Sequence, residues 1–319
     1  MDDKRKLLVT PYKDPDLDWT ACAFGYAEFL HKNNKNAIAG VFWTPHRESQ
    51  FVQKKFNIPD FLNAENIINN IDWIIIVDSS DLRSLSNQIH PEKVIEVIDH
   101  RKVHEAHNFP NAKVQIELVG SAATLIAEKF HKSKTAISQE AAAFLFSAII
   151  SNTINFQANV TTERDHNMAD WLKTKFPLPE NYIHEMFFDK SQFNKTLKEI
   201  FLDDFATFHF NNHNLGIVQL EIVNVNNLVE KNLVEIKKIL EEVKKERSVE
   251  LIFLTCIDLE GAFNQIIVVD ESTENLVKEA LKVTFENGVT KRDGILMRKE
   301  IVPLIKEIME TSKFSYRGR

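Results

Sequence analysis

The stretch KLLVTPYKDPDLDW, residues 6–19, joins an apolar run to a cluster of acids. Residues 7–10 are apolar or β-branched and predict a β-strand, and the loop that follows holds Asp14, Asp16 and Asp18. Carboxylates a few Å apart repel each other, and a purely structural loop gains nothing from that repulsion. Either these side chains are solvated in a polar turn, or a cation lies among them.

The composition is that of a globular protein large enough for two domains. The chain has 319 residues, of which 44% are hydrophobic and 27% are charged. No apolar run approaches ~20 residues, and the N-terminus lacks a signal-peptide profile, so we expect no membrane span and a cytoplasmic location. Cys22 and Cys256 predict neither a disulfide framework nor a thiolate metal site. The net charge of -7 argues against a protein that coats nucleic acid.

The first half of the chain alternates strands and helices. Strands are predicted at 7–10, 37–43, 72–78, 93–99 and 112–118, and helices at 18–33, 46–56, 120–132 and 138–151. The strands are apolar on both faces, which indicates a parallel sheet covered on two sides. The helix at 138–151 is almost wholly apolar, so we expect it to be buried.

The second half begins near residue 195 with a different pattern. Two strand-like runs flank NNHN, residues 211–214, which predicts a hairpin. A long charged helix at 226–247, two more strands and two helices at 273–284 and 299–312 follow. We therefore predict an α/β protein with a domain at 1–188, a linker at 189–194 and a smaller α/β domain at 195–319.

Acidic residues follow three predicted strands of the first domain. The first strand leads into the loop at 14–18, the strand at 72–78 ends in Asp78, and the strand at 93–99 ends in Asp99 and His100. Ligands of an open parallel sheet bind where the carboxyl ends of its strands converge. Each acid alone is explained by a turn, but together they predict a divalent cation site for Mn²⁺, Mg²⁺, Zn²⁺ or Fe²⁺.

The ordered motifs YKDPDLD, IIIVDSS, VIDHR, VGSAATLIAE and IISNTINFQANVTTERD resemble those of the DHH phosphoesterase superfamily. The similarity is greatest to the family II, manganese-dependent inorganic pyrophosphatases. MRKEIVP, residues 297–303, resembles the DHH-associated second domain. The resemblance implies a parallel-sheet DHH domain, a smaller DHH-associated domain and an active site in the cleft between them.

The resemblance also implies a metal centre. Two Mn²⁺ ions, or Mg²⁺ or Co²⁺ in their place, would be held by Asp16 on one metal, Asp18 on the other and Asp78 between them. His100 matches the metal-binding first histidine of the DHH motif. Asp99 would orient that imidazole, a common role for a carboxylate near a metal-bound histidine.

Phosphate binding is implied for Arg298 and Lys299 at the start of the last predicted helix. Arg101 stands where the family has the second histidine of its motif, and we interpret it as a cation that stabilises charge on the phosphoryl group. On this interpretation Asp78, Asp99 and Arg101 carry the catalytic roles.

The sequence departs from the family pattern at several positions. Tyr12 replaces a metal-binding histidine, Asn152 an aspartate, Ser79 a histidine, Ala206 a lysine, and Asp14 stands where the pyrophosphatases tend to have asparagine. Tyr12 is a poor ligand, which leaves a single-metal enzyme as an alternative to two ions. Asn152 could coordinate through its carbonyl, and Asp14 could partly restore the negative charge.

The predicted function is hydrolysis of a phosphoanhydride, pyrophosphate first, by metal-activated water. One alternative is a DHH phosphoesterase that acts on a phosphodiester, a short oligonucleotide or another small phosphate ester. A second is a catalytically decayed phosphate-binding protein. We expect a small phosphate-containing substrate and no membrane partner, and a homodimer is a further hypothesis.

Overall fold

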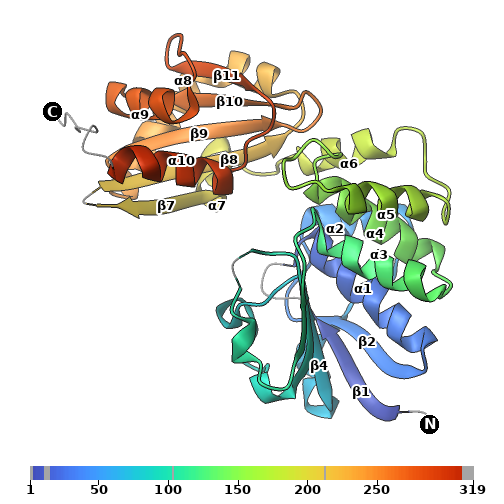
Figure 1. Ribbon diagram of the computed structural model, residues 1–319. Coiled ribbons are helices and arrows are strands. Elements are labelled where there is room, and N and C mark those ends of the chain that lie inside the picture. Colours follow the sequence, from blue (N-terminus) through green and yellow to red (C-terminus); the bar gives the residue numbers. More distant parts are fainter. Residues whose placement is uncertain (1–2, 11–14, 103, 212, 311–319) are drawn as a thin grey trace. The chain divides into compact units, whose positions relative to one another are not determined.

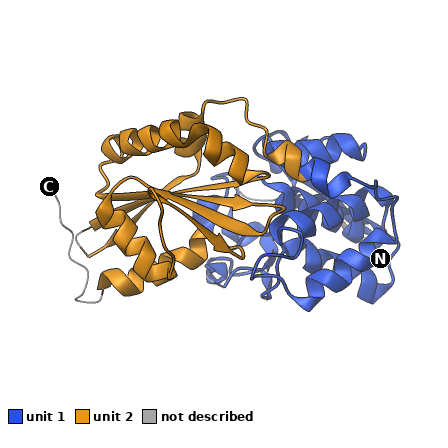
Figure 2. Cartoon of the chain, turned by 90° about the horizontal axis from the view of Figure 1, so that it is seen from above, with its two compact units in different colours: residues 1–186 blue, residues 187–319 orange. Residues whose placement is uncertain are grey.

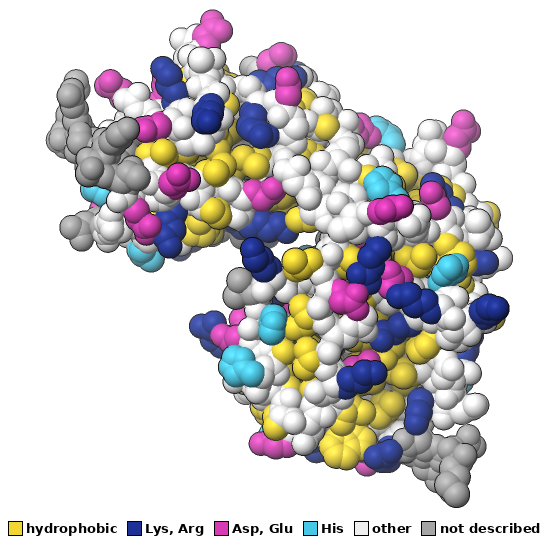
Figure 3. Space-filling view, viewed as in Figure 1, with side chains coloured by type: hydrophobic (Ala, Val, Ile, Leu, Met, Phe, Trp, Pro, Cys, Tyr) yellow, Lys and Arg dark blue, Asp and Glu magenta, His cyan; other side chains and the backbone are white. Residues whose placement is uncertain are grey.

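The computed structural model describes residues 3–10, 15–102, 104–211 and 213–310 (Figure 1). The chain divides into two compact units, residues 1–186 and 187–319 (Figure 2), and each is described by itself. No helix of the described residues is long and apolar enough to cross a membrane. On the face shown in Figure 3, basic and acidic side chains are interspersed over both units.

The first unit is built on a six-stranded sheet. Its strands are β1 (Asp3–Thr10), β2 (Lys35–Val41), β3 (Leu62–Asn63), β4 (Trp73–Val77), β5 (Val94–Asp99) and β6 (Lys113–Ile116). They lie in the order β3-β2-β1-β4-β5-β6, and every neighbouring pair is parallel. Strand order reverses between β1 and β4, and ligands of an open parallel sheet bind at the carboxyl ends of the strands beside such a reversal.

The two faces of this sheet are covered differently. The helices are α1 (Leu17–Lys32), α2 (Arg47–Lys55), α3 (Ala122–Ser133), α4 (Gln139–Asn152) and α5 (Glu163–Lys173). Helix α1 packs against α3 and α4 (Figure 1), and α4 is buried from Ala141 to Ser151, as its apolar sequence predicts. The core on the opposite face includes side chains from short 3-10 turns, such as Ile68, together with sheet residues such as Ile74.

The second unit has a five-stranded mixed sheet. Helix α6 (Tyr182–Lys190) crosses the division, and the elements that follow are α7 (Leu197–Asp203), β7 (Phe205–Phe210), β8 (His213–Ile222), α8 (Val225–Glu246), β9 (Leu251–Asp258), β10 (Phe263–Val268), α9 (Glu271–Leu281), β11 (Val289–Asp293) and α10 (Arg298–Glu310). The order is β11-β10-β9-β8-β7. Among the described strands of this sheet, β8 and β9 form the only parallel pair. One apolar core includes α8, and another includes α9 and α10.

The α/β class with two sheets is confirmed, and several elements were not predicted. Among them are β3, β11, α5, α6 and α7. Helix α7 has seven residues and β3 has two, so each is too short for its pattern to repeat often enough to be recognised. Phe210 lies opposite His213 in the antiparallel pair β7–β8, which agrees with the predicted hairpin. Asp189 and Lys190, expected in a linker, complete α6.

Candidate metal centre

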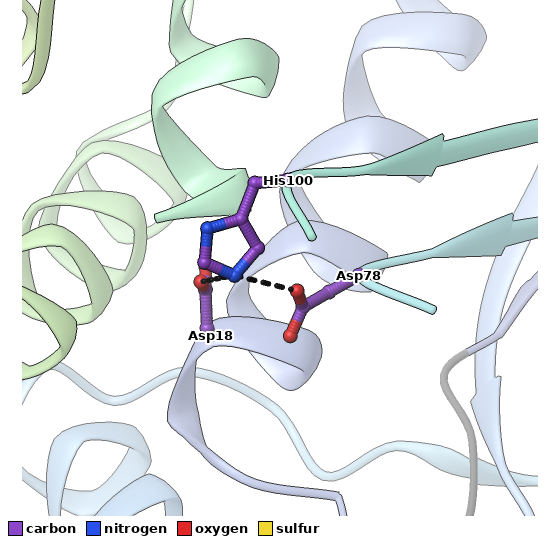
Figure 4. A group of neighbouring side chains, drawn as sticks. All are labelled: Asp18, Asp78 and His100. Carbon is purple, nitrogen blue, oxygen red and sulfur yellow. Dashed lines mark ion pairs between the residues drawn. The ribbon is translucent and has the colours of Figure 1, made fainter. Parts of the chain in front are cut away.

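Asp18, Asp78 and His100 form the carboxylate–histidine cluster of the first unit (Figure 4). One ligand atom from each lies within 4.8 Å of the others, and both carboxylates are buried. The His100 Nε2 atom is 3.2 Å from Asp78 Oδ1 and 4.0 Å from Asp18 Oδ2. The three side chains come from the start of α1, the end of β4 and the end of β5, so the strand-end pattern of the sequence correctly predicts their convergence.

Asp18 is fixed by the N-terminus of α3. Its Oδ1 accepts hydrogen bonds from the Ser121 hydroxyl at 2.8 Å and from the Ala123 N–H at 2.9 Å. Its Oδ2 accepts from the Ala122 N–H at 2.9 Å. The free N–H groups at a helix N-terminus are satisfied by this carboxylate, which is thereby held in one orientation.

The His100 ring is oriented by a backbone carbonyl. Its Nδ1 lies 2.8 Å from the carbonyl oxygen of Val119. The prediction that Asp99 orients the imidazole needs correction, because the Asp99 Oδ1 accepts instead from the backbone N–H of His100 at 2.7 Å and of Arg101 at 3.3 Å. Its Oδ2 accepts from the Ser80 hydroxyl. Asp99 therefore shapes the loop that carries His100 and does not hold the ring.

Asp78 combines an unusual backbone with a poorly compensated charge. Its φ is +52°, a left-handed conformation that aspartate tolerates better than most residues. The Oδ1 atom is buried, and among the described residues it has no hydrogen-bond partner unless the His100 Nε2 atom, 3.2 Å away, is protonated. Burial, followed by the charge of Asp18, raises the pKa of Asp78 to about 7. The Arg101 Nη2 donates to the Asp78 carbonyl oxygen at 3.2 Å, which brings the predicted phosphate-stabilising arginine next to the cluster.

Asp16 lies near the cluster and also caps a helix. It is the N-cap of α1, where its Oδ1 accepts from the Trp19 N–H at 3.1 Å. Burial raises the pKa of Asp16 well above its usual range, and the charges of Asp78 and Asp18 raise it further. The predicted ligands Tyr12 and Asp14 lie outside the described residues.

Asn152, the last residue of α4, contacts the cluster although it lies far from Asp18 in the sequence. Its Nδ2 donates to Asp18 Oδ2 at 2.5 Å, so the amide lies against a candidate ligand. The adjacent Ser151 hydroxyl donates to Glu48, whose charge also raises the pKa of Asp16. Ser79, where the family pattern has histidine, lies with its hydroxyl 3.0 Å from that of Ser84.

The predicted phosphate-binding residues lie in the second unit. Arg298 begins α10, and its guanidinium donates to the Asp204 carbonyl at 2.7 Å and forms an ion pair with Asp204 Oδ1 at 2.9 Å. Lys299 is exposed beside it. Ala206, where a lysine was expected, is a half-buried β7 residue opposite Ile217.

Sequence reasoning assigned no role to the loop before α3. Val119 orients His100, Gly120 donates its N–H to Asp165 Oδ2 at 2.9 Å, and Ser121 holds Asp18 while it caps α3. A serine before an apolar helix is a recognisable N-cap signal, and it could have located Ser121. A backbone carbonyl such as that of Val119 has no such signal.

Known proteins resemble this chain in sequence. A model of the DHHA2 domain matches residues 184–308. A protein of Clostridium acetobutylicum named "Probable manganese-dependent inorganic pyrophosphatase" is 30% identical over 310 residues, which are 95% of this chain and 98% of that protein. A protein of Bacillus cytotoxicus with the same name is 27% identical over 308 residues, covering 96% of this chain and 99% of the relative.

Solved structures extend the comparison. A Methanococcus jannaschii protein assigned to the family II inorganic pyrophosphatases superposes with a TM-score of 0.68 at 28% identity, over 96% of this chain and 100% of that chain. An exopolyphosphatase-related protein from Bacteroides fragilis, at 14% identity and a TM-score of 0.52, shares the fold. The chain belongs to the family of manganese-dependent, family II inorganic pyrophosphatases.

Proposed function

We propose that the protein is a metal-dependent phosphohydrolase and that inorganic pyrophosphate is its substrate. The observation that carries the proposal is the carboxylate–histidine cluster at the crevice of the first sheet. Family membership supports the reaction class, since the relatives named above are manganese-dependent inorganic pyrophosphatases.

The cluster suits a divalent cation because its charges are incomplete without one. Since Nδ1 of His100 faces a carbonyl and must carry the proton to donate, Nε2 of the neutral ring presents a lone pair to Asp18 and Asp78. Two carboxylates and a lone pair repel one another unless a positive charge lies among them. The buried Asp78 Oδ1 without a hydrogen-bond partner fits the same requirement.

We assign Asp18, Asp78 and His100 to one cation, and Asp16 together with Asp78 to a second. Oxygen and imidazole ligands suit Mn²⁺, with Mg²⁺ and Co²⁺ as further candidates. When bound, such cations supply Lewis-acid stabilisation of a phosphoryl oxygen and lower the pKa of water. Tyr12, Asp14 and Asn152 are proposed as weaker contributors.

The chain's own cations would hold the substrate. Arg101, beside Asp78, would neutralise charge that develops on the phosphoryl oxygens, and Asp99 would keep its loop in place. Arg298 and Lys299 would bind phosphate in the second unit, at the start of α10. We propose residues 1–188 as the catalytic domain, 195–319 as the substrate-binding domain and 189–194 as the connector.

The test is phosphate release from pyrophosphate by metal-stripped protein that is resupplied with Mn²⁺. We expect turnover that depends on Mn²⁺ and is lost in Asp78→Ala. Asp81→Ala removes a partly exposed carboxylate from the same loop and serves as the matched control. Equal activity of Asp78→Ala and the unaltered protein would reject the assigned site.

A second candidate is favoured by one observation. Ala206 leaves the second unit without the lysine expected for pyrophosphate, so a phosphodiester or another small phosphate ester is the alternative substrate. Hydrolysis of a short oligonucleotide in the absence of pyrophosphatase activity would support this alternative substrate. Mn²⁺ binding without any turnover would support a catalytically decayed phosphate-binding protein. The predicted cytoplasmic location and homodimer stay predictions, and the second can be measured by gel filtration with light scattering.

A further inference from the structure

One face of strand β8 changes from apolar to polar along its length. Leu215 and Ile217 are buried in the core that α9 and α10 cover. Because side chains alternate along a strand, Gln219 and Glu221 continue the same row beyond that core. Gln219 is buried and Glu221 is half-buried, so this end of the row requires polar partners.

Those partners form one continuous chain of contacts. The Lys190 Nζ atom lies 3.0 Å from Glu221 Oε2, and the Gln219 Nε2 donates to Glu221 Oε1 at 3.0 Å. The Gln219 Oε1 in turn accepts from the backbone N–H of Arg298 at 2.6 Å. Lys190 is thereby connected through two side chains to the first residue of α10.

A hydrogen bond holds the end of α6 against the end of β8. The N–H of Val223, just after β8, donates to the Ser191 hydroxyl at 2.8 Å. Ser191 follows Lys190 directly, so the backbone that carries the lysine is tied to the carboxyl end of β8. With its side chain 22% exposed, Lys190 is held in place and still reaches solvent.

The charges of this cluster alternate. Lys190 pairs with Glu221, and Arg298 pairs with Asp204. Burial opposes ionisation of Glu221, but the charge and hydrogen bond of Lys190, with help from Gln219, lower the pKa of that carboxyl below its usual value. Gln219 contacts the backbone N–H of Arg298, and the Arg298 guanidinium itself pairs with Asp204. The charge of Arg298 also lowers the pKa of Glu221, so both cations act on the same carboxylate.

We propose that Lys190 is a further phosphate-binding residue of the second unit, positioned by Glu221 to act beside Arg298. This inference rests on the proposed function. Two cations in one cluster suit an anion with two phosphoryl groups, because each cation can take one of them. Ala206 in β7 stands where a substrate-binding lysine was expected, and Lys190 at the end of α6 would supply a positive charge in its place.

The competing explanation is that Lys190 only neutralises a half-buried glutamate. Lys190→Ala alone does not separate the two, since it also leaves Glu221 without its cation. The decisive variant is therefore Lys190→Met combined with Glu221→Gln, which removes both charges and keeps the side-chain volumes similar. The control is Lys195→Ala, which breaks the exposed 2.6 Å pair with Asp203 in the same unit.

The experiment compares KM and kcat for pyrophosphate with Mn²⁺, calorimetric binding of inorganic phosphate, and urea unfolding. We expect the double variant to keep the stability of the unaltered protein and to bind phosphate about tenfold more weakly, with a similar rise in KM. Lys190→Arg should recover most of that loss, and Lys195→Ala should change neither quantity. Normal phosphate binding in the double variant would overturn the proposal.

The two proposals fail in different ways. If the unaltered protein does not hydrolyse pyrophosphate but binds phosphate with the dependence on Lys190 described above, the proposed function fails and the role of Lys190 is supported. If it hydrolyses pyrophosphate and the double variant has an unchanged KM and unchanged phosphate binding, the reverse holds. Absence of phosphate binding by the unaltered protein overturns the role of Lys190.

Discussion

The Nδ1 atom of His100 lies 2.8 Å from the carbonyl oxygen of Val119, and this contact determines which ring nitrogen faces the carboxylates. A carbonyl can only accept, so the neutral ring carries its proton on Nδ1 and directs the Nε2 lone pair at Asp18 and Asp78. The protein therefore fixes the tautomer that a metal ligand requires by means of its backbone alone.

The stability of the metal-free protein should fall as pH rises. In the folded state the pKa of Asp78 is about 7 against 3.8 for the free group, so its stabilising contribution is present at low pH and is lost between about pH 4 and pH 7. Without a metal, a proton on Nε2 of His100 takes the place of the cation. Burial lowers the pKa of His100, but the hydrogen bond of the protonated ring to Asp78 and the charges of Asp78 and Asp18 raise it to about 10 from 6.5. That contribution is lost between about pH 6.5 and pH 10.

Urea unfolding at pH 5 and pH 8 after chelation measures this trend. Mn²⁺ should stabilise the protein more at pH 8 than at pH 5, because it competes with protons for the same atoms. The double variant Asp78→Asn with His100→Gln should flatten the pH dependence and abolish the Mn²⁺ effect. A metal-free protein that is more stable at pH 8 than at pH 5 would contradict the assignment.

Asn152→Asp should strengthen cation binding and weaken the metal-free fold. The amide donor 2.5 Å from Asp18 Oδ2 would become a second carboxylate, which removes one hydrogen bond from that buried oxygen and adds charge repulsion, at a cost of about 1–3 kcal/mol. With Mn²⁺ the added charge should raise affinity on the order of tenfold. Calorimetry and urea unfolding measure both effects, and Asn87→Asp, an exposed position of the same unit, controls for net charge. Equal Mn²⁺ affinity in the two variants would place Asn152 outside the site.

Gly120→Ala should disturb the site through its supporting loop. A Cβ atom at Gly120 would lie 2.5 Å from Thr153 Cγ2 and 3.0 Å from Asp165 Oδ2, so the backbone between Val119 and Ser121 must shift. We expect a loss of about 1–3 kcal/mol in the free energy of unfolding together with weaker Mn²⁺ binding. At Gly25 the added Cβ meets only flexible atoms of Leu145, and Gly25→Ala should leave Mn²⁺ binding intact. Unchanged Mn²⁺ binding in Gly120→Ala would show that the loop does not hold the ligands.

Arg298→Lys should raise KM although it conserves charge. The guanidinium bonds the Asp204 carbonyl and carboxylate at the same time, and an ammonium cannot reproduce that planar fork. We expect a KM for pyrophosphate about tenfold higher with a smaller change in kcat. Arg292→Lys alters an arginine of β11 that donates to the Asp293 and Gly294 carbonyls, and it should leave KM unchanged. Identical kinetics for the two variants would argue against a phosphate-binding role for Arg298.

The sequence predicted the parts of the fold and site that follow from periodicity. Runs apolar on both faces indicated the parallel sheet, and acids at the ends of three runs placed Asp18, Asp78 and His100 at one edge. The family resemblance added Asn152, which the structure brings against Asp18.

Contacts made by the backbone, or across long separations, could not be predicted. The Val119 carbonyl has no side-chain signature, and for that reason the carboxylate of Asp99 was a reasonable but incorrect partner for the imidazole. The ion pair of Arg298 with Asp204 joins residues 94 positions apart, and no local pattern links them. Short elements such as β3 were not predicted because two residues are too few to show a repeating pattern.

The contact between Asn152 and Asp18 joins residues separated by 134 positions within the first unit, residues 1–186. A contact of such high sequence separation forms late in folding, after the intervening sheet and helices have closed the loop. A nascent chain that ends before α4 would carry Asp18, Asp78 and His100 without the amide that completes their surroundings. We therefore expect such a nascent chain to bind the cation less tightly than the folded first unit does.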